Sequence, residues 1–161
     1  MPATILPARL TALTVAVLTA FALAVSLAAP ADATSRRQKK IHNSLEIARN
    51  QKGDPYRYGA DGPHRFDCSG LIRFSYGKAG IWMPRTSDRQ ARRARRIGKH
   101  DLRKGDLMFF HSGGDVYHVG IFGGWNGHGR RRVLHAPGSG RRVNTDLVWT
   151  GSWFAGTLRG A

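Results

Sequence analysis

The spacing of hydrophobic and polar positions changes along the chain, and each spacing predicts a different element. Ile41, Leu45 and Ala48 recur at the interval of one helical face, and a Gly-Asp-Pro break follows at 53–55. This pattern predicts a helix over 41–51. The residues after it combine glycine, proline and tyrosine without a period, so we expect a loop there.

A second helix is predicted to begin directly after Asp67. Leu71 and Ile72 open an apolar helical face, and Gly80 is suited to end it. The carboxylate of Asp67 can cap the first turn, which places Cys68 among unpaired backbone N–H groups. Because the helix dipole favours an anion at this end, we expect a lowered pKa for the Cys68 thiol.

Beyond Gly105 the apolar runs become short and are separated by glycine-rich turns. We expect strands at 106–110, 118–122, 132–136, 142–144 and 154–158. Helices that precede a run of short strands indicate an α+β domain with an antiparallel sheet. The intervening stretch, 84–100, is polar and rich in arginine, which is typical of a solvated helix or loop.

The first thirty or so residues have the pattern of a secretory signal. An N-terminal arginine precedes an uncharged stretch at 10–29, and small residues follow it. We expect cleavage after Ala33, with Ala31 as the alternative site, although 10–29 is also long enough to remain as a membrane anchor. The chain is therefore divided into a signal peptide at 1–33, a basic linker at 34–40 and one domain at 41–161, secreted and associated with the cell wall.

The charge balance is strongly basic, with 26 Lys and Arg against 10 Asp and Glu and a net charge of +16. Such a charge indicates a polyanionic partner. Nucleic acid is disfavoured because the chain carries an export pattern and no nucleic-acid motif. An anionic wall polymer fits better, and a general arginine bias of the genome would also explain the charge. The candidate basic patch consists of Arg92, Arg93, Arg95 and Arg96.

The chain has a single cysteine, Cys68, which excludes a disulfide within it. A lone thiol in an oxidising compartment is a liability unless it is used, so we expect a nucleophile. A thiol nucleophile needs a base and a group that orients the base. His118 and His135 lie on two predicted strands joined by a glycine-rich turn. Adjacent antiparallel strands would set the two imidazoles side by side, with His118 facing Cys68.

Several blocks then resemble the bacterial NlpC/P60 cysteine peptidases. Pro-Tyr-Arg-Tyr-Gly at 55–59 and Phe-Asp-Cys-Ser-Gly-Leu at 66–71 are similar to the first signature of that family. Gly-Asp-Leu-Met-Phe-Phe at 105–110, His-Val-Gly-Ile-Phe at 118–122 and His-Ala-Pro at 135–137 follow in the family's order. The resemblance covers about residues 41–159. The rim of the cleft departs from the family at three places: Tyr58 replaces a usual tryptophan, Ala60 a usual glycine, and His64-Arg65 a more common Asn-Gly type pair.

The resemblance implies a papain-like α+β fold, with N-terminal helices packed on a small antiparallel sheet. It implies hydrolysis of peptidoglycan stem peptides, most commonly at the D-γ-glutamyl–diamino acid bond, without a metal or another cofactor. By matching position, Cys68 would attack, His118 would be the base and His135 the orienting residue. The candidate residues for substrate and oxyanion contacts are Tyr56, Asp67, Ser69 and Arg85.

Two other functions remain open at this point. A related amidase of the CHAP group would cut between the lactyl-linked sugar and the first alanine. A basic exported protein without catalysis could instead coat anionic polymers, with its cysteine incidental. We expect the protein to act as a monomer.

Overall fold

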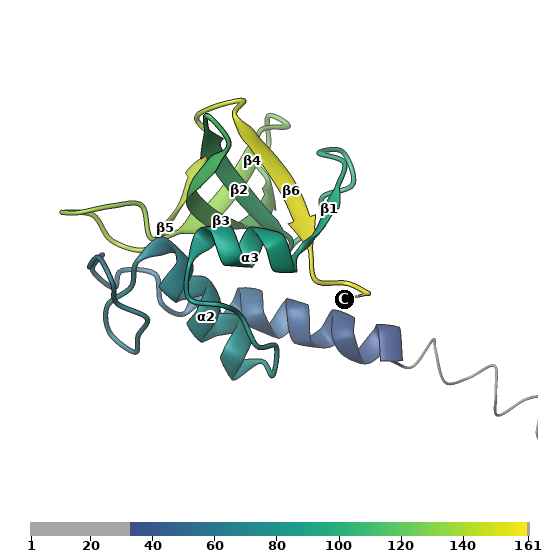
Figure 1. Cartoon of the computed structure of the whole chain (residues 1–161), viewed down its shortest axis with the longest axis horizontal. Helices are drawn as coiled ribbons and strands as arrows, with labels where there is room; N and C mark the ends of the chain where they lie inside the picture. The colour runs from purple at the N-terminus through teal and green to yellow at the C-terminus, as the bar shows by residue number, and fades with distance from the viewer. Residues whose placement is uncertain (1–32, 161) are drawn as a thin grey trace, which may run out of the picture. The chain divides into compact units, whose positions relative to one another are not determined.

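The computed structural model describes residues 33–160 (Figure 1). The proposed signal segment therefore lies outside the described residues except at its last position. Within 33–160, no helix is both long and apolar enough to cross a membrane. The packing contacts described below lie within the compact structural unit that begins at Arg37.

The first helix covers residues 33–49 of the described chain, so it begins earlier than the predicted 41–51 and ends two residues sooner. The stretch expected to be a basic linker, 34–40, is helical. Arginine, lysine and glutamine are good helix formers, so the loss of apolar spacing does not end the helix. Arg37 also anchors this stretch, because its Nε donates to the carbonyl of Leu158 at 2.9 Å.

The helix predicted after Asp67 is confirmed as α2 (Cys68–Lys78). The Asp67 carboxylate caps it by accepting the N–H of Gly70 at 2.7 Å. Gly80 follows the helix with a φ of 77°, which glycine adopts without steric cost. Tyr76 is also fully buried on the apolar face, and its hydroxyl donates to the carbonyl of Gly105.

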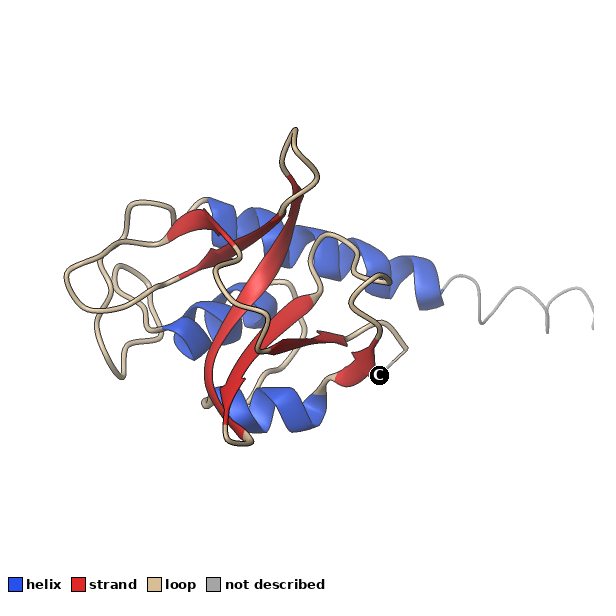
Figure 2. Cartoon of the chain, turned by 90° about the horizontal axis from the view of Figure 1, so that it is seen from above, coloured by secondary structure: helices blue, strands red, loops and turns tan. Residues whose placement is uncertain are grey.

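The remaining elements form one antiparallel sheet and one short helix. They are α3 (Ser87–Arg93), β1 (Arg95–Ile97), β2 (Leu107–Ser112), β3 (Asp115–Trp125), β4 (Arg131–His135), β5 (Asn144–Leu147) and β6 (Trp153–Thr157). The strands are hydrogen-bonded in the order β1-β6-β2-β3-β4-β5. In Figure 1, α2 and α3 lie below the sheet, and Figure 2 views the sheet from above. The predicted α+β architecture is confirmed.

Both faces of the central strand β2 are buried, which explains its unbroken apolar run. Leu107 and Phe109 point to the helical side and join the main core with residues of α2. Met108 and Phe110 point to the opposite side and form a second cluster with Phe122 and other residues. Because successive side chains of a strand point to opposite faces, this one apolar segment contributes to two hydrophobic cores.

The short edge strand β1 was not predicted. Its three residues are exposed, exposed and partly buried. The sequence therefore shows no alternation of polar and apolar residues from which this strand could be predicted. It forms because its backbone pairs with β6, with Arg96 opposite Gly156. The arginine-rich stretch therefore contains the helix α3 and a strand, rather than one solvated helix or loop.

Candidate active site

Cys68 is the first residue of α2 and is partly exposed. The first turn of α2 is pressed against the preceding loop. A Cβ at Gly70 would lie 2.1 Å from the carbonyl oxygen of Ala60, so only glycine allows this approach. The backbone N–H of Asp67 donates to the same carbonyl at 2.8 Å. These contacts fix the position from which the Cys68 side chain projects.

Asp67 is buried beside the cysteine and accepts hydrogen bonds at both carboxylate oxygens. Oδ1 accepts from Gly70 N, the Ser69 hydroxyl and Arg85 Nη1 at 2.7, 3.1 and 3.0 Å. Oδ2 accepts from Gly59 N at 2.9 Å and from Arg85 Nη2 at 2.5 Å. A carboxylate offers about four lone-pair positions, so these five donors saturate it.

The electrostatics of this network keep Asp67 ionised. Burial alone would raise its pKa, but the hydrogen bonds from Arg85, Gly70 and Gly59 outweigh burial and hold the pKa below its ordinary value. Arg85 Nη1 also donates to the Ser69 hydroxyl at 3.0 Å. From α3, the buried Gln90 amide donates to the carbonyls of Ser69 and Pro84, which joins the two segments.

The two histidines predicted to meet do so on adjacent strands. His118 lies on β3, His135 ends β4, and both are buried. His118 Nε2 and His135 Nδ1 are 2.7 Å apart, and the rings stand nearly perpendicular at 80°. Between them on the sheet, Gly120 must lack a side chain, because a Cβ there would meet Val133 Cγ2 at 2.3 Å.

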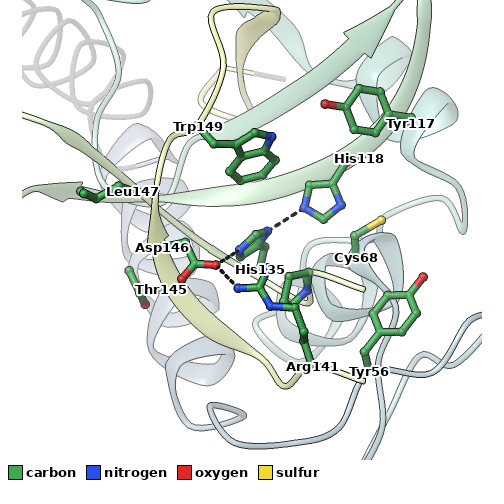
Figure 3. Close-up of a pocket in the computed structure, with 11 residues that line it drawn as sticks. Tyr56, Cys68, Tyr117, His118, His135, Arg141, Thr145, Asp146, Leu147 and Trp149 are labelled. Atoms are coloured by element: carbon green, nitrogen blue, oxygen red, sulfur yellow. Dashed lines mark hydrogen bonds and ion pairs between the residues drawn. The ribbon is translucent and has the colours of Figure 1, made fainter. Parts of the chain in front are cut away.

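Behind His135 lies a carboxylate that the sequence analysis missed. Asp146 Oδ2 is 3.1 Å from His135 Nε2 and accepts from Arg141 Nη2 at 2.9 Å. Asp146 Oδ1 accepts from the Asn144 amide at 3.0 Å. Figure 3 shows this line of side chains running from Cys68 through both histidines to Asp146. No motif marks Asp146, because its place follows from the pairing of β5 with β4.

Burial controls the protonation of the thiol and of the adjacent imidazole. It raises the pKa of Cys68, outweighing the backbone N–H groups of Val119, Ser69 and Cys68 itself. The expected lowering of this pKa by the helix start is therefore wrong. Burial, with His135 nearby, also lowers the pKa of His118 to about 3. Both shifts favour a neutral thiol beside a neutral imidazole in the free protein.

A cleft of about 920 Å³ opens over these groups. Its walls include Cys68, both histidines and the exposed aromatic residues Tyr117 and Trp149. The Trp149 ring stacks on His135 with centroids 5.3 Å apart and meets His118 edge-on at 5.8 Å. A planar apolar surface thus covers the histidine pair on the side of the cleft, which limits the access of water to their hydrogen bond.

A second, smaller pocket of about 500 Å³ shares Tyr56, Cys68 and Tyr117 with the first. It also contains Asp67, Ser69 and Arg85, so all the predicted site residues lie around the cysteine. Burial, followed by the nearby Cys68 and Asp67, raises the pKa of Tyr56 and keeps its phenol protonated. Sequence reasoning missed four other residues that line the cleft: Asp146, Arg141, Trp149 and Tyr117.

The fold and the site together define a class of protein. It is an α+β domain in which a cysteine at a helix start lies beside a buried histidine pair carried by an antiparallel sheet. The NlpC/P60 family model matches residues 53–160. The chain belongs to the NlpC/P60 family.

Individual relatives agree with this assignment. A probable endopeptidase of Corynebacterium glutamicum is 43% identical over 95 residues, which is 59% of this chain and 42% of the relative. The crystal structure of the P60 domain of a Mycobacterium avium subspecies paratuberculosis antigen matches 77% of this chain and 98% of that domain. Its TM-score is 0.66 at 30% identity. The Mycobacterium tuberculosis peptidoglycan hydrolase RipB has a TM-score of 0.68 at 26% identity, covering 79% of this chain and 68% of RipB. The chain spans less than half the length of the curated relatives it matches.

Proposed function

We propose that this protein is a cysteine endopeptidase that cuts stem peptides of peptidoglycan, at the bond between D-γ-glutamate and the following diamino acid. The observation that carries the proposal is the hydrogen-bonded pair His118–His135 beside Cys68 at the floor of an open cleft. Probable endopeptidase and peptidoglycan hydrolase are the functions named for the two relatives from Corynebacterium glutamicum and Mycobacterium tuberculosis. The choice of bond rests on the family resemblance of the motifs around Cys68.

The proposed reaction begins from the neutral pair. His118 takes the thiol proton as the Cys68 sulfur attacks the scissile carbonyl, forming the C–S bond and a tetrahedral oxyanion. The Cys68 N–H, at the helix start, and the protonated Tyr56 phenol are the proposed donors to this oxyanion. The C–N bond then breaks, and His118 returns the proton to the departing amine. Water, deprotonated by His118, hydrolyses the thioester and releases Cys68.

We propose that the pocket beside Asp67 receives the free amine end of the stem peptide. Five donors already occupy the Asp67 carboxylate, so it has no free oxygen lone pair for the substrate. It therefore acts on the substrate chiefly by positioning neighbouring residues. Its bonds fix the Ser69 hydroxyl and the Arg85 guanidinium at the wall of this pocket. The Ser69 hydroxyl accepts from Arg85 and donates to Asp67, so one lone pair remains for a substrate ammonium group.

The test is mass spectrometry of peptidoglycan fragments after digestion by the wild-type protein, Cys68→Ala and His42→Ala. We expect new diamino-acid amino ends from the wild type and from His42→Ala, whose histidine is exposed on the first helix. Cys68→Ala should give none. Free lactyl groups with new L-alanine ends would replace the proposal with a CHAP-like amidase. Wall binding without cleavage, equal in wild type and Cys68→Ala, would indicate a non-enzymatic binder.

We further propose that exposed arginines of α3 and β1 attach the protein to anionic wall polymers. Arg92, Arg93, Arg95 and Arg96 are all exposed. Adjacent strand residues face opposite ways, so Arg95 and Arg96 spread charge over both sides of the edge strand. Arg85, at the start of the same stretch, is instead committed to Asp67.

Replacing these four arginines by glutamine should reduce sedimentation with purified walls, most strongly at low salt. A matched control neutralises four other exposed cations: Lys52, Arg65, Lys78 and Arg130. Equal losses in both variants would indicate general charge rather than a patch.

Export is proposed from the uncharged segment 10–29 and the small residues that follow it. The mass of the protein recovered from the culture medium should correspond to cleavage after Ala33. Recovery only from the membrane fraction, at full mass, would indicate the retained anchor instead.

A further inference from the structure

The strongest unassigned feature of the site is the carboxylate behind the histidine pair. Asp146 is held by three side chains: His135 Nε2 at 3.1 Å, Arg141 Nη2 at 2.9 Å and Asn144 Nδ2 at 3.0 Å. Asn144 stands directly opposite His135 on β5, and Asp146 is the diagonal cross-strand neighbour on the same face. The sheet therefore points this carboxylate at one nitrogen of His135.

The charge of Asp146 makes it an acceptor only. Burial would raise its pKa, but hydrogen bonds and charge from His135 and Arg141 outweigh burial and hold the pKa below its ordinary value. An ionised carboxylate can accept a hydrogen from an imidazole but cannot donate one. The proton shared with His135 must therefore reside on His135 Nε2.

The proton on His135 Nε2 determines the tautomers of both imidazole rings, including the nitrogen that faces the nucleophile. Burial lowers the pKa of His135, so at neutral pH the ring is neutral and carries one proton. With that proton on Nε2, His135 Nδ1 has a lone pair, and the 2.7 Å contact requires His118 Nε2 to donate. Neutral His118 is then left with an unprotonated Nδ1. Figure 3 shows the His118 ring beside Cys68, which is the partner from which Nδ1 can take a proton.

We propose that Asp146 is a positioning residue that selects, through His135, the tautomer in which His118 can act as a base toward Cys68. The proposal deepens the proposed cysteine peptidase function and rests on it for its catalytic consequence. Without Asp146, His135 could place its proton on Nδ1 and turn His118 Nε2 into an acceptor. The His118 proton would then lie on Nδ1, where it blocks removal of the thiol proton.

Arg141 and Asn144 support this role by fixing the carboxylate. The backbone of Arg141 is itself anchored to the loop before α2, because its carbonyl accepts the N–H of Tyr56 at 2.9 Å. The Asn144 Oδ1 atom is buried without a partner, so this amide can rotate and offer an acceptor when position 146 carries an amide. Asp146→Asn can therefore keep an oxygen toward His135 while it removes the charge.

The first experiment needs no variant and no peptidoglycan. Nitrogen-15 NMR of the histidine rings at neutral pH should show His118 protonated on Nε2 with Nδ1 bare, and His135 in the same state. A wild-type His118 protonated on Nδ1 would overturn the proposal. In Asp146→Ala we expect His135 to lose its single tautomer.

The second experiment measures alkylation of Cys68 by iodoacetamide, and kcat and KM where peptidoglycan is cut. Asp146→Ala should slow alkylation at neutral pH and lower kcat by about tenfold or more, with KM nearly unchanged. Asp146→Asn should lie between Asp146→Ala and the wild type. Asp101→Asn, an exposed carboxylate remote from the cleft, should match the wild type.

Alkylation at the wild-type rate and with the wild-type pH profile in Asp146→Ala would refute the role of Asp146. A change in KM alone would do the same. NMR and alkylation require no hydrolysis, so a wild-type protein that fails to cut peptidoglycan would count against the proposed function and leave the role of Asp146 to be judged by these two readouts.

Discussion

Two aspartate–arginine pairs flank the cysteine, and they are built for different tasks. On the side of α2, Asp67 and Arg85 have side-chain exposures of 9% and 32%. On the side of β5, Asp146 and Arg141 are more open, at 30% and 57%. The first carboxylate accepts two backbone N–H groups, from Gly59 and Gly70, whereas the second accepts only from side chains.

The difference separates a pair that holds the backbone from a pair that directs a proton. Loss of a buried carboxylate that caps a helix leaves several hydrogen-bond donors without an acceptor at once, so its main cost is in stability. Loss of the partly exposed Asp146 costs less, because it leaves one buried donor, His135 Nε2, without its acceptor, while the exposed Arg141 can turn to water. Its cost should lie in catalysis. In the proposed mechanism, the same two residue types thus serve the nucleophile from one side and the base from the other.

The largest expected effect is that of Asp67→Ala. This change removes the cap of α2, leaves the Gly59 and Gly70 amides without their acceptor and strands the Arg85 guanidinium. We expect the free energy of unfolding to fall by about 3 kcal/mol, within the range for broken buried pairs. Urea denaturation with an unchanged m-value would measure it.

Asp146→Ala is the matched variant and should cost about 1 kcal/mol, the lower end for one buried donor left without its acceptor. Asp67→Asn keeps a capping oxygen and should fall between the two. Equal destabilisation by Asp67→Ala and Asp146→Ala would remove the distinction between the two sides.

Tyr56 stands at the boundary of the two sides, since both pockets include it. If its phenol donates to the oxyanion, Tyr56→Phe should lower kcat by about a hundredfold, the usual cost of one such donor, and change KM little. His42→Ala is the control, because His42 is exposed on the first helix and lines neither pocket. A rise in KM at constant kcat would assign Tyr56 to substrate binding instead.

The parts of the site that the sequence predicted are those fixed by local rules. Asp67 and Gly80 bound α2 because capping chemistry depends on a few neighbouring residues. His118 and His135 meet because a short turn between apolar strands implies an antiparallel pair. These features need little knowledge of distant residues, so periodicity and turn signals suffice.

The parts that the sequence could not predict depend on distant partners. Asp146 lies in a segment without apolar alternation, and only the register with β4 brings it to His135. The edge strand β1 exists through backbone pairing with β6 and has no apolar signature. The sign of the Cys68 pKa shift was missed for a similar reason, because burial by the opposing sheet exceeds the local effect of the helix start.

As the pH falls, the free energy of unfolding should decrease first through protonation of the buried histidines. The folded pKa of His118, about 3, lies below its unfolded value of 6.5, so the unfolded chain binds the extra proton. Stability is then complete above about pH 6.5 and falls as the pH drops toward 3, by about 1.4 kcal/mol per pH unit for this residue. His135 shifts in the same direction. Asp67 and Asp146, with lowered pKa values, add a loss only below their unfolded pKa of 3.8.

The unfolding free energy measured in urea from pH 7 to pH 4 checks this order. His118→Gln should flatten the slope, whereas His42→Gln, at an exposed position, should retain it. A slope that His118→Gln leaves unchanged would show that the acid sensitivity lies elsewhere in the chain.

The last prediction concerns the two arginines, and it tests the comparison of the two pairs from the cationic partner of each. Arg85→Gln leaves a buried carboxylate without its bidentate partner and should cost about 2 kcal/mol of stability. Arg141→Gln leaves Asp146 with His135 and Asn144, and should cost less than about 1 kcal/mol. It also removes a nearby positive charge that lowers the pKa of His135, so that pKa should rise when followed by NMR. An equal loss of stability from both variants would mean that solvent exposure does not set the strength of the two pairs, and that the side facing the base is as structural as the side that caps α2.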